Sequence, residues 1–414
     1  MSVQKDGQGP GKLRVVMAQL DFLVGDIPGN TQKVIEATRR AEQEHQADLV
    51  VFPELCLTGY PPEDLLLRPS MDVRVADALE TLRGEHLGPA IIVGAPIREG
   101  ALLYNAAVAI EQGNITGRYF KRFPPNYQVF DEKRYFANGV DTLVMDIKGV
   151  PVGITICEDI WSEGPVEDAA AAGARLVVNL NASPYDIDKQ VRRKALVERK
   201  AFENRVSIVY VNLIGGQDEL VFDGGSVVYD HSGVLAAEAP QFSEGLYPVD
   251  FVCEHHCQPI SQPAVAEPSL EENVYKALVL GVQDYVNKNG FKSVVLGLSG
   301  GIDSAVTLAV AADALGAAAV HAADLDGDGD LDVLSASDGD DTIAWYENRG
   351  EWRFGQQQVI SDATNLTEFV YAADLDGDGD PDVLSASWVD DKIAWYENLG
   401  GGSFGIPQVI TTNA

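Results

Sequence analysis

Hydrophobic residues in the first 260 positions form short runs separated by segments of helical spacing. Apolar runs bounded by turn residues predict buried strands, and here they lie at 12–21, 47–55, 89–97, 150–156, 175–184, 207–215 and 224–233. The run at 104–121 predicts a hairpin of two strands joined by a Gly-Asn turn. Apolar spacings of three and four residues predict helices, and these occur at 30–45, 167–172 and 189–204. The alternation of strands and helices predicts an α/β domain.

The pattern changes after residue 257. Residues 258–269 are polar and rich in proline, which is typical of a linker. An amphipathic helix is predicted over 270–287, with Glu271 and Glu272 favourably placed at its positive end. A buried strand, VVLGL, then runs through SGGIDS into an alanine-rich helix that ends near residue 317.

The last part of the chain is an internal repeat. Residues 321–348 recur as 371–398, and both copies carry the strand patterns VLSAS and IAWYEN after an acidic loop, DLDGDGD. From residue 321 onwards there are about twenty Asp and Glu residues against three Lys and Arg. We therefore predict four segments: a domain at 1–257, a linker at 258–269, a fragment at 270–322 and a repeat region at 323–414.

The formal net charge of -33 argues against nucleic acid and anionic membranes as partners. Four cysteines are too few for a disulfide scaffold, and residues 1–12 lack the apolar core of a secretion signal. No apolar run is long enough to cross a bilayer. We expect a soluble, cytoplasmic protein with reduced cysteines.

Three predicted strands end in residues that suit attack on an amide. Glu54, Lys121 and Cys157 each close one strand, and strand ends are a usual place for a site. A thiolate can add to the carbonyl carbon, a carboxylate can move protons and an ammonium can stabilise the oxyanion. Taken singly, the cysteine could equally be a structural core residue, and the two charged residues could be solvated surface groups.

The string Cys253-Glu-His-His-Cys257 suggests a zinc site. Four ligands packed so closely in sequence cannot all turn towards one tetrahedral ion, so we do not predict a metal here.

Three blocks of the front segment resemble a known family. FPELCLTGYPPEDLLLRP (52–69), KRFPPNYQVFDEKRYF (121–136) and ICEDIW (156–161) are similar to the signatures of the nitrilase, or carbon-nitrogen hydrolase, superfamily. Within this superfamily, the blocks resemble the glutaminase domains of glutamine-dependent NAD synthetases. The resemblance implies an αββα nitrilase-type sandwich that hydrolyses glutamine, and it implies a homo-oligomer.

The same resemblance assigns roles to residues. It implies that Glu54 is the general base, Lys121 the cation beside the oxyanion and Cys157 the nucleophile, with Glu132 as a second glutamate beside them. It also implies glutamine-binding residues, namely Tyr127, Ser183 and Lys189. The residues at 122–124 and Gln128 depart from the family pattern at the pocket mouth.

The string SGGIDSA resembles the pyrophosphate loop of the ATP pyrophosphatase family, as found in NAD synthetase domains. Backbone amides at such a helix start bind phosphate well. The resemblance implies an ATP site with Mg²⁺ near Asp303, formed by Gly297, Leu298, Ser299, Gly300, Gly301, Ile302, Asp303 and Ser304. Residues 320–322 then run directly into the acidic repeat, so we expect an incomplete doubly wound α/β fragment without a complete deamido-NAD pocket.

The acidic loops place carboxylates at alternate positions, which suits calcium. The candidate ligands are Asp324, Asp326, Asp328, Asp332, Asp374, Asp376, Asp378 and Asp382. The alternative is an acidic loop that is merely solvated. The repeats resemble FG-GAP or VCBS blades, which implies a C-terminal all-β pair of propeller-like repeats; two blades cannot close a propeller.

Three functions remain open at this point. The first is glutamine hydrolysis that supplies ammonia for ATP-dependent amidation of deamido-NAD, with ligase activity doubtful. The second is a free-standing cysteine amidohydrolase, and the third is a calcium-binding scaffold or adhesion protein with an inert front domain. The similar strings HAAD (321–324) and YAAD (371–374) suggest a hypothesis about the point where the synthetase-like fragment meets the repeats. We hypothesise that the chain is a truncated NAD synthetase fused there to a foreign propeller fragment.

Overall fold

The computed structural model describes residues 11–266, 268–291, 294, 302–315, 320–337, 341–349, 353–362, 364, 367–387 and 389–412. The chain divides into two compact units, Met1–Gly281 and Val282–Ala414, which we describe separately. The boundary falls inside the long helix α6 (Leu270–Lys288), which confirms the helix expected over 270–287.

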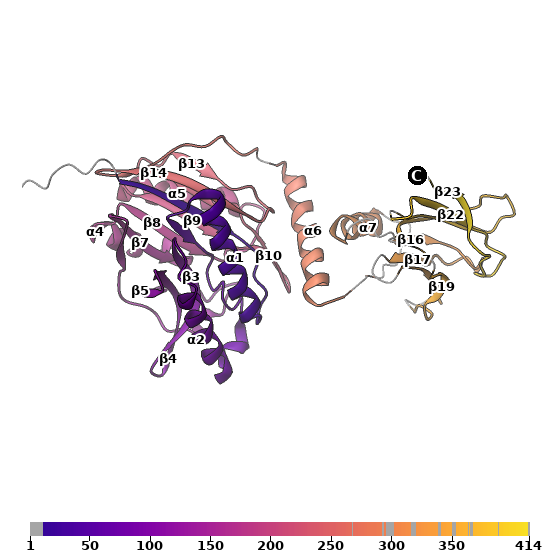
Figure 1. Cartoon of the computed structure of the whole chain (residues 1–414), viewed down its shortest axis with the longest axis horizontal. Helices are drawn as coiled ribbons and strands as arrows, with labels where there is room; N and C mark the ends of the chain where they lie inside the picture. The colour runs from indigo at the N-terminus through magenta and orange to yellow at the C-terminus, as the bar shows by residue number, and fades with distance from the viewer. Residues whose placement is uncertain are drawn as a thin grey trace, which may run out of the picture. The chain divides into compact units, whose positions relative to one another are not determined.

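The first unit contains two large mixed sheets (Figure 1). One sheet has the strand order β15-β14-β1-β2-β3-β4-β5. Its strands are β1 (Gly11–Gln19), β2 (Leu49–Val51), β3 (Ala90–Glu99), β4 (Leu102–Glu111), β5 (Asn114–Phe120), β14 (Gly245–Cys253) and β15 (Cys257–Pro259). The hairpin expected at 104–121 is present, because β4 and β5 pair antiparallel around a Gln112–Gly113 turn. The sequence did not reveal that β14 would become the antiparallel neighbour of β1.

The other large sheet has the order β13-β12-β9-β8-β7-β6. Its strands are β6 (Val144–Ile147), β7 (Val150–Ile156), β8 (Leu176–Asn181), β9 (Ser207–Asn212), β12 (Val227–Tyr229) and β13 (Leu235–Glu238), and a small hairpin is formed by β10 (Ile214–Gln217) and β11 (Leu220–Asp223). Strands β7, β8 and β9 are parallel, so their carboxyl ends share one edge.

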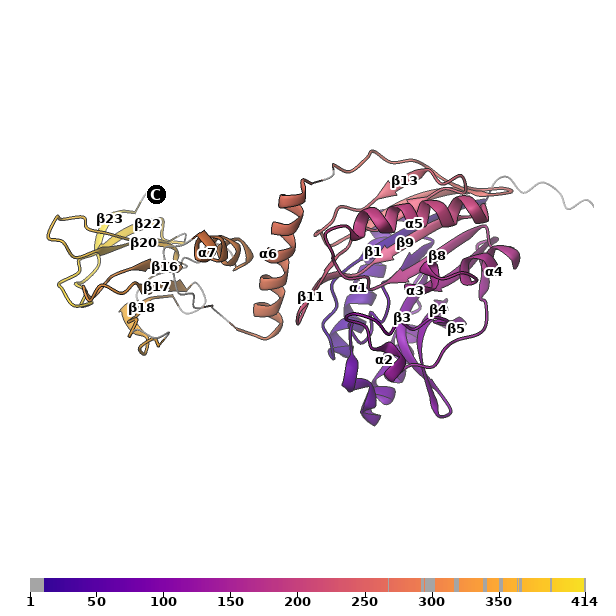
Figure 2. The ribbon, with the colours of Figure 1, turned by 180° about the vertical axis from the view of Figure 1, so that it is seen from behind.

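Side chains from alternate positions hold four layers together. In β1, Leu13, Val15 and Met17 pack between the two sheets, whereas Val16 and Ala18 pack under helices. The helices of the first unit are α1 (Ile27–His45), α2 (Pro69–Gly84), α3 (Glu158–Trp161), α4 (Pro165–Ala171) and α5 (Lys189–Asn204), with short 3₁₀ turns at Glu63–Leu67 and Glu132–Arg134. Helices α1 and α2 cover the first sheet, and α4 and α5 cover the second (Figure 2). This arrangement confirms the α/β sandwich expected from the sequence.

The second unit contains helix α7 (Ile302–Leu315) and two four-stranded antiparallel sheets. The first sheet, repeat 1, consists of β16 (Val320–Ala323), β17 (Asp332–Ser337), β18 (Thr342–Tyr346) and β19 (Gln358–Ser361). The second sheet, repeat 2, consists of β20 (Thr367–Ala373), β21 (Asp382–Ser387), β22 (Lys392–Tyr396) and β23 (Gln408–Thr411). Residues 320–322, which we assigned to the end of the α/β fragment, form the first strand of repeat 1 and pair antiparallel with β17.

The cysteine pattern differs from the expectation of reduced thiols. Cys253 and Cys257 lie opposite each other where β14 and β15 pair, and they form a disulfide. The three-residue turn between them brings the two Cα atoms within 4.0 Å, a proximity that the sequence spacing alone did not reveal. Cys56 and Cys157 are free and buried.

Candidate active site

A buried cation lies between two carboxylates at the ends of the strands. The Nζ atom of Lys121 is 2.6 Å from Oε1 of Glu54 and 2.9 Å from each carboxylate oxygen of Glu132. Burial by itself lowers the pKa of Lys121, but the charges of Glu132 and Glu54 outweigh it and hold that pKa well above the usual value. The lysine is therefore an ammonium with its three protons directed at carboxylates.

Other buried groups orient these carboxylates. Asn105 on β4 donates to Glu54 at 2.7 Å and to Glu132 at 3.4 Å, and the hydroxyl of Tyr60 donates to Glu132 at 2.9 Å. The backbone N–H of Ala182 donates to Oε2 of Glu54 at 3.0 Å. Sequence reasoning missed Asn105 and Tyr60; the only available signal was a polar residue within the apolar run that forms β4.

Cys157 follows β7 and is electrostatically coupled to the same carboxylates. Its φ of 43° lies in the left-handed region, a strained conformation that turns the chain from β7 into α3. Burial raises the pKa of its thiol well above the usual value, the charge of Glu54 raises it further, and Lys121 opposes both. The structure therefore brings Glu54, Lys121, Glu132 and Cys157 together, and the cysteine is a thiol at rest.

A buried carboxylate next to this cysteine, Asp159, connects the nucleophile turn to the loop after β5. Asp159 accepts the backbone N–H groups of Arg122 and Phe123, both at 3.0 Å, and that of Ile156 at 3.1 Å. Burial raises the pKa of Asp159 to about 6, although these hydrogen bonds lower it. The sequence analysis assigned no role to Asp159, which lies in the string ICEDIW.

Two of the three expected glutamine-binding residues lie near the cysteine at a more open position. The hydroxyl of Tyr127, which is 45% exposed, donates to Glu158 at 2.7 Å. Nζ of Lys189 lies 5.0 Å from the centre of the Trp161 ring. The pKa of Lys189 is lowered, and burial is the main cause. Both residues lie close enough to Cys157 that ionisation of its thiol would raise the pKa of Tyr127 and of Lys189. Glu158 was not predicted.

Ser183, the third expected glutamine-binding residue, is buried after β8. Its hydroxyl accepts from Nε of Arg193 at 3.2 Å, and its carbonyl accepts from the same guanidinium at 2.7 Å. Arg193 is buried and also pairs with Asp223 at 2.7 Å. This ion pair, which was not predicted, fixes the loop that carries Ser183.

A cavity of about 130 Å³ adjoins Glu132 on the side of Tyr60. Besides Tyr60 and Glu132, the cavity is lined by several apolar and aromatic residues, including Leu55, Phe130 and Phe136.

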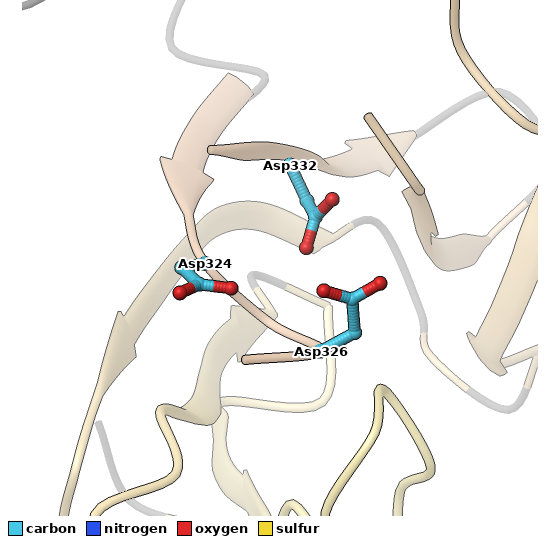
Figure 3. A group of neighbouring side chains, drawn as sticks. All are labelled: Asp324, Asp326 and Asp332. Carbon is cyan, nitrogen blue, oxygen red and sulfur yellow. The ribbon is translucent and has the colours of Figure 1, made fainter. Parts of the chain in front are cut away.

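The acidic loops of the repeats each bring three carboxylates together. Side-chain oxygens of Asp324, Asp326 and Asp332 lie within 4.8 Å of one another (Figure 3). The corresponding group in repeat 2 is Asp374, Asp376 and Asp382. Asp328 and Asp378 were expected in these groups but belong to neither; each accepts the backbone N–H two residues on.

The expected ATP loop falls almost entirely outside the described residues. Gly297, Leu298, Ser299, Gly300 and Gly301 are not described, whereas Ile302, Asp303 and the backbone of Ser304 begin α7.

Among the described residues, no helix is long and apolar enough to span a membrane.

The first unit is thus an α/β sandwich of two mixed sheets, in which Glu54, Lys121, Glu132 and Cys157 lie together at the strand ends. The carbon-nitrogen hydrolase family model matches residues 14–255, and the chain belongs to that family. A NAD synthase model matches residues 274–341, and an FG-GAP-like repeat model matches residues 324–385.

Curated relatives cover the front three quarters of the chain. The glutamine-dependent NAD(+) synthetase of Xylella fastidiosa strain 9a5c is 47% identical over 314 residues, which are 75% of this chain and 57% of the relative. The protein of the same name from Thermotoga maritima is 41% identical over 74% of this chain and 59% of its own length. The chain therefore spans less than two thirds of these relatives.

Solved structures agree with this relationship. Glutamine-dependent NAD+ synthetase from Acinetobacter baumannii, solved in complex with ADP, has a TM-score of 0.72 and 40% identity over 74% of this chain and 58% of that chain. An amidase of the nitrilase superfamily from Nesterenkonia AN1 has a TM-score of 0.54 and 28% identity over 60% of this chain and 93% of that chain.

Proposed function

We propose that the front unit hydrolyses glutamine to glutamate and ammonia with Cys157 as the nucleophile. The observation that carries this proposal is the buried Lys121, held between Glu54 and Glu132 and electrostatically coupled to the Cys157 thiol. Removing two carboxylates and an ammonium from water is costly, and apolar residues of similar volume often stabilise a core as well or better. Stability alone therefore does not explain these buried charges.

In the first half-reaction, Glu54 accepts the thiol proton as sulfur attacks the carboxamide carbon. Oε2 of Glu54 accepts one backbone N–H, which leaves a lone pair for that proton. The charge of Lys121 stabilises the developing oxyanion, although its three protons already have carboxylate partners. Glu54 then protonates the departing nitrogen, the C–N bond breaks, and ammonia leaves a glutamyl thioester.

In the second half-reaction, water replaces the nitrogen. Glu54 accepts a proton from water as its oxygen attacks the thioester carbon, the C–S bond breaks, and the proton returns to the Cys157 sulfur. Glu132 stabilises the charged form of Lys121 through the ion pair at 2.9 Å. Burial raises the pKa of Glu132 itself, and the charge of Lys121 opposes that rise. The net change is one amide and one water converted to one acid and ammonia.

The amino-acid end of glutamine is assigned to the more open residues around the cysteine. Tyr127 and Lys189, together with the backbone region of Ser183, provide polar groups for an α-ammonium and an α-carboxylate. Family membership supports this assignment.

The ammonia is proposed to serve ATP-dependent amidation of deamido-NAD, with Mg²⁺ and the loop Gly297–Ser304 holding ATP. The likeness to glutamine-dependent NAD(+) synthetases supports this purpose. The NAD synthase model matches residues 274–341, and within that range β16 already pairs with β17 of repeat 1. We expect little NAD formation by this chain itself.

The two repeats are assigned as propeller-type blades that bind calcium. Three clustered carboxylates per repeat provide the hard oxygen ligands that calcium prefers. Asp332 also accepts two backbone N–H groups, from Leu325 and Asn348, so it links the acidic loop to its sheet.

A second candidate is a free-standing amidase that acts on another small amide. The Nesterenkonia amidase favours it, because that enzyme is matched over 93% of its length by the front unit's fold. One experiment separates the candidates: supply glutamine with ATP, Mg²⁺ and deamido-NAD, supply simple aliphatic amides in parallel, and measure the released acids and NAD separately. Glutamate released much faster than product from simple aliphatic amides supports the glutaminase, and equal rates support the amidase.

A further inference from the structure

A buried ammonium outside the catalytic cluster, that of Lys200, holds the segment that follows α3. Lys200 is 2% exposed and lies on α5. Its Nζ atom donates to the carbonyl of Ser162 at 2.9 Å and to Oε1 of Glu167 at 2.7 Å. Oε2 of Glu167 accepts the backbone N–H of Gly164 at 2.8 Å. Lys200 therefore fixes both ends of the turn at 162–164, the α3–α4 turn, directly at Ser162 and through Glu167 at Gly164.

The carboxylate in this pair is ionised. Burial raises the pKa of Glu167, but hydrogen bonds from Lys200 and from the Gly164 N–H outweigh burial, so this pKa lies below its usual value. The contact between Lys200 and Glu167 is therefore an ion pair between a buried ammonium and a carboxylate that is about one third exposed.

The α3–α4 turn positions an aromatic ring beside a residue assigned to glutamine. Trp161 is the last residue of α3 and immediately precedes the turn. The Nζ atom of Lys189 lies 5.0 Å from the centre of the Trp161 ring. Lys189 opens α5, and Lys200 lies eleven residues later, which is about three helical turns, so the two lysines share one face of the helix. Helix α5 thus contacts one short segment at two neighbouring residues, Trp161 and Ser162.

The other end of α3 is held by different contacts. The backbone N–H of Cys157 donates to the carbonyl of Leu180 on β8 at 2.8 Å. Asp159 accepts three backbone N–H groups and the hydroxyl of Tyr119. Cys157 can therefore keep its place when the α3–α4 turn moves, whereas Trp161 adjoins the turn and moves with it.

We propose that Lys200 is a positioning residue for the recognition of glutamine, because it holds the turn that places Trp161 against Lys189. The inference rests on the proposed glutaminase function, in which Lys189 binds the amino-acid end of the substrate. An ammonium is attracted to the face of an aromatic ring, so the ring restricts where the Lys189 ammonium can lie. Loss of the Lys200 ammonium frees the turn, lets the ring move and weakens binding of the amino-acid end.

The first test separates recognition from chemistry in the full-length protein. Lys200→Met should raise the KM for glutamine about three- to tenfold, the range expected of one cation–π contact, and should change kcat less than KM. Iodoacetamide has no amino-acid end, and it alkylates the Cys157 sulfur with loss of iodide. The rate of this alkylation, read by peptide mass spectrometry, should be the same in Lys200→Met and wild type.

Lys194→Met is the matched control. Lys194 lies on the same helix and pairs with Glu238 of β13 at the same 2.7 Å, and both side chains are largely buried. Its partner is not part of the α3–α4 turn, so its KM for glutamine should equal that of wild type.

A double-mutant cycle shows whether Lys200 acts through the ring. In protein that already carries Trp161→Leu, adding Lys200→Met should change KM less than about twofold, because the ring that Lys200 positions is gone. Glu167→Gln tests the same turn without removing a buried side chain. Its amide has one acceptor oxygen and cannot accept from both Lys200 and Gly164, so KM should rise in the same direction.

The possible results separate this inference from the function on which it rests. A wild type that hydrolyses glutamine no faster than simple aliphatic amides removes the proposed function and this inference with it. If wild type prefers glutamine, an unchanged KM in both Lys200→Met and Glu167→Gln overturns the inference alone. An equal rise of KM in Lys194→Met, or a fall in the alkylation rate of Cys157 that matches the loss of glutaminase activity, also overturns it, because either result indicates a general structural role.

Discussion

The phenol of Tyr119 donates a 2.8 Å hydrogen bond to the buried carboxylate of Asp159. Tyr119 lies near the end of β5 and Asp159 lies two residues after Cys157, so this contact connects the strand that presents the lysine to the turn that presents the nucleophile. Asp159 touches none of the proposed reacting atoms. Asp159 affects the chemistry by fixing the distance between Lys121 and Cys157, which do contribute reacting atoms.

Replacing Asp159 by Asn should therefore lower kcat for glutamine hydrolysis. The amide places an N–H group against backbone N–H donors, so the loop after β5 shifts, and displacement of a reacting group by about 1 Å costs on the order of 100-fold. KM should change less than kcat, because Ser183 and Lys189, two of the three residues assigned to glutamine, lie outside the loop after β5. Tyr119→Phe removes one of four hydrogen bonds and should have a smaller effect. A rise in KM at constant kcat would contradict the positioning role.

The same carboxylate predicts a pH dependence of stability. The pKa of Asp159 is raised from 3.8 to about 6, so its neutral form is favoured in the folded state. Its stabilising contribution is complete below pH 3.8 and is lost as the pH rises through about 6. The shift of roughly two units corresponds to about 3 kcal/mol.

The measurement is the free energy of unfolding in urea for wild type and Asp159→Asn. The advantage of the wild type should shrink by about 2 kcal/mol between about pH 4.5 and pH 7.5, because only the acid titrates there and about 1 kcal/mol is already lost below pH 4.5. Parallel pH curves for the two proteins would show that Asp159 stays ionised throughout.

Removing the central cation should destabilise the front unit severely. Lys121→Met leaves Glu54 and Glu132 buried without a counter-charge, which costs about 3–5 kcal/mol. Lys276→Met is a matched control, because its partner Glu272 and the lysine are both about half exposed, and such pairs contribute less than about 1 kcal/mol. Similar unfolding free energies for the two variants would contradict the assigned ion-pair network.

Sequence alone predicted the sandwich and the residues at the strand ends, because apolar runs and their terminal polar residues are local features. Helix α1 is an example: apolar spacing located it, and only its start at Ile27, capped by Asp26, was missed. The partners of Glu54 could not be predicted in the same way. Asn105 lies 51 residues away on a strand read as uniformly apolar, and only the paired register of β3 and β4 turns it towards the site.

The acidic loops show a second limit of sequence reasoning. Four alternating acids suggested four ligands, but the glycines at positive φ bend the loop so that Asp328 turns to its own backbone. The disulfide between Cys253 and Cys257 was also missed, since it depends on the register of β14 with β15.

The two free cysteines should differ sharply in their response to glutamine-like electrophiles. Cys56 is fully buried, and burial raises the pKa of its thiol to about 12, with no carboxylate base among its hydrogen-bond partners. A chloroketone analogue of glutamine should label Cys157 alone, as read by peptide mass spectrometry. Cys157→Ala should abolish both labelling and glutaminase activity while circular dichroism is unchanged, and Cys56→Ala should retain both. Retained activity in Cys157→Ala would remove the nucleophile assignment.

Calcium should stabilise the repeat unit through the clustered acids and not through their neighbours. Binding of calcium at one hundred times its Kd adds about 2.7 kcal/mol to the unfolding free energy of a single site. Asp326→Asn removes a negative charge from the cluster of repeat 1. Asp328→Asn removes the same charge from a side chain that lies two residues further along the chain and outside the cluster. The Asp326 variant should bind calcium about tenfold more weakly, which corresponds to about 1.4 kcal/mol, and the Asp328 variant should resemble the wild type. Titration calorimetry gives the affinities and thermal unfolding with and without a chelator gives the stabilities; equal losses in both variants would mean that calcium responds only to the net charge of the loop.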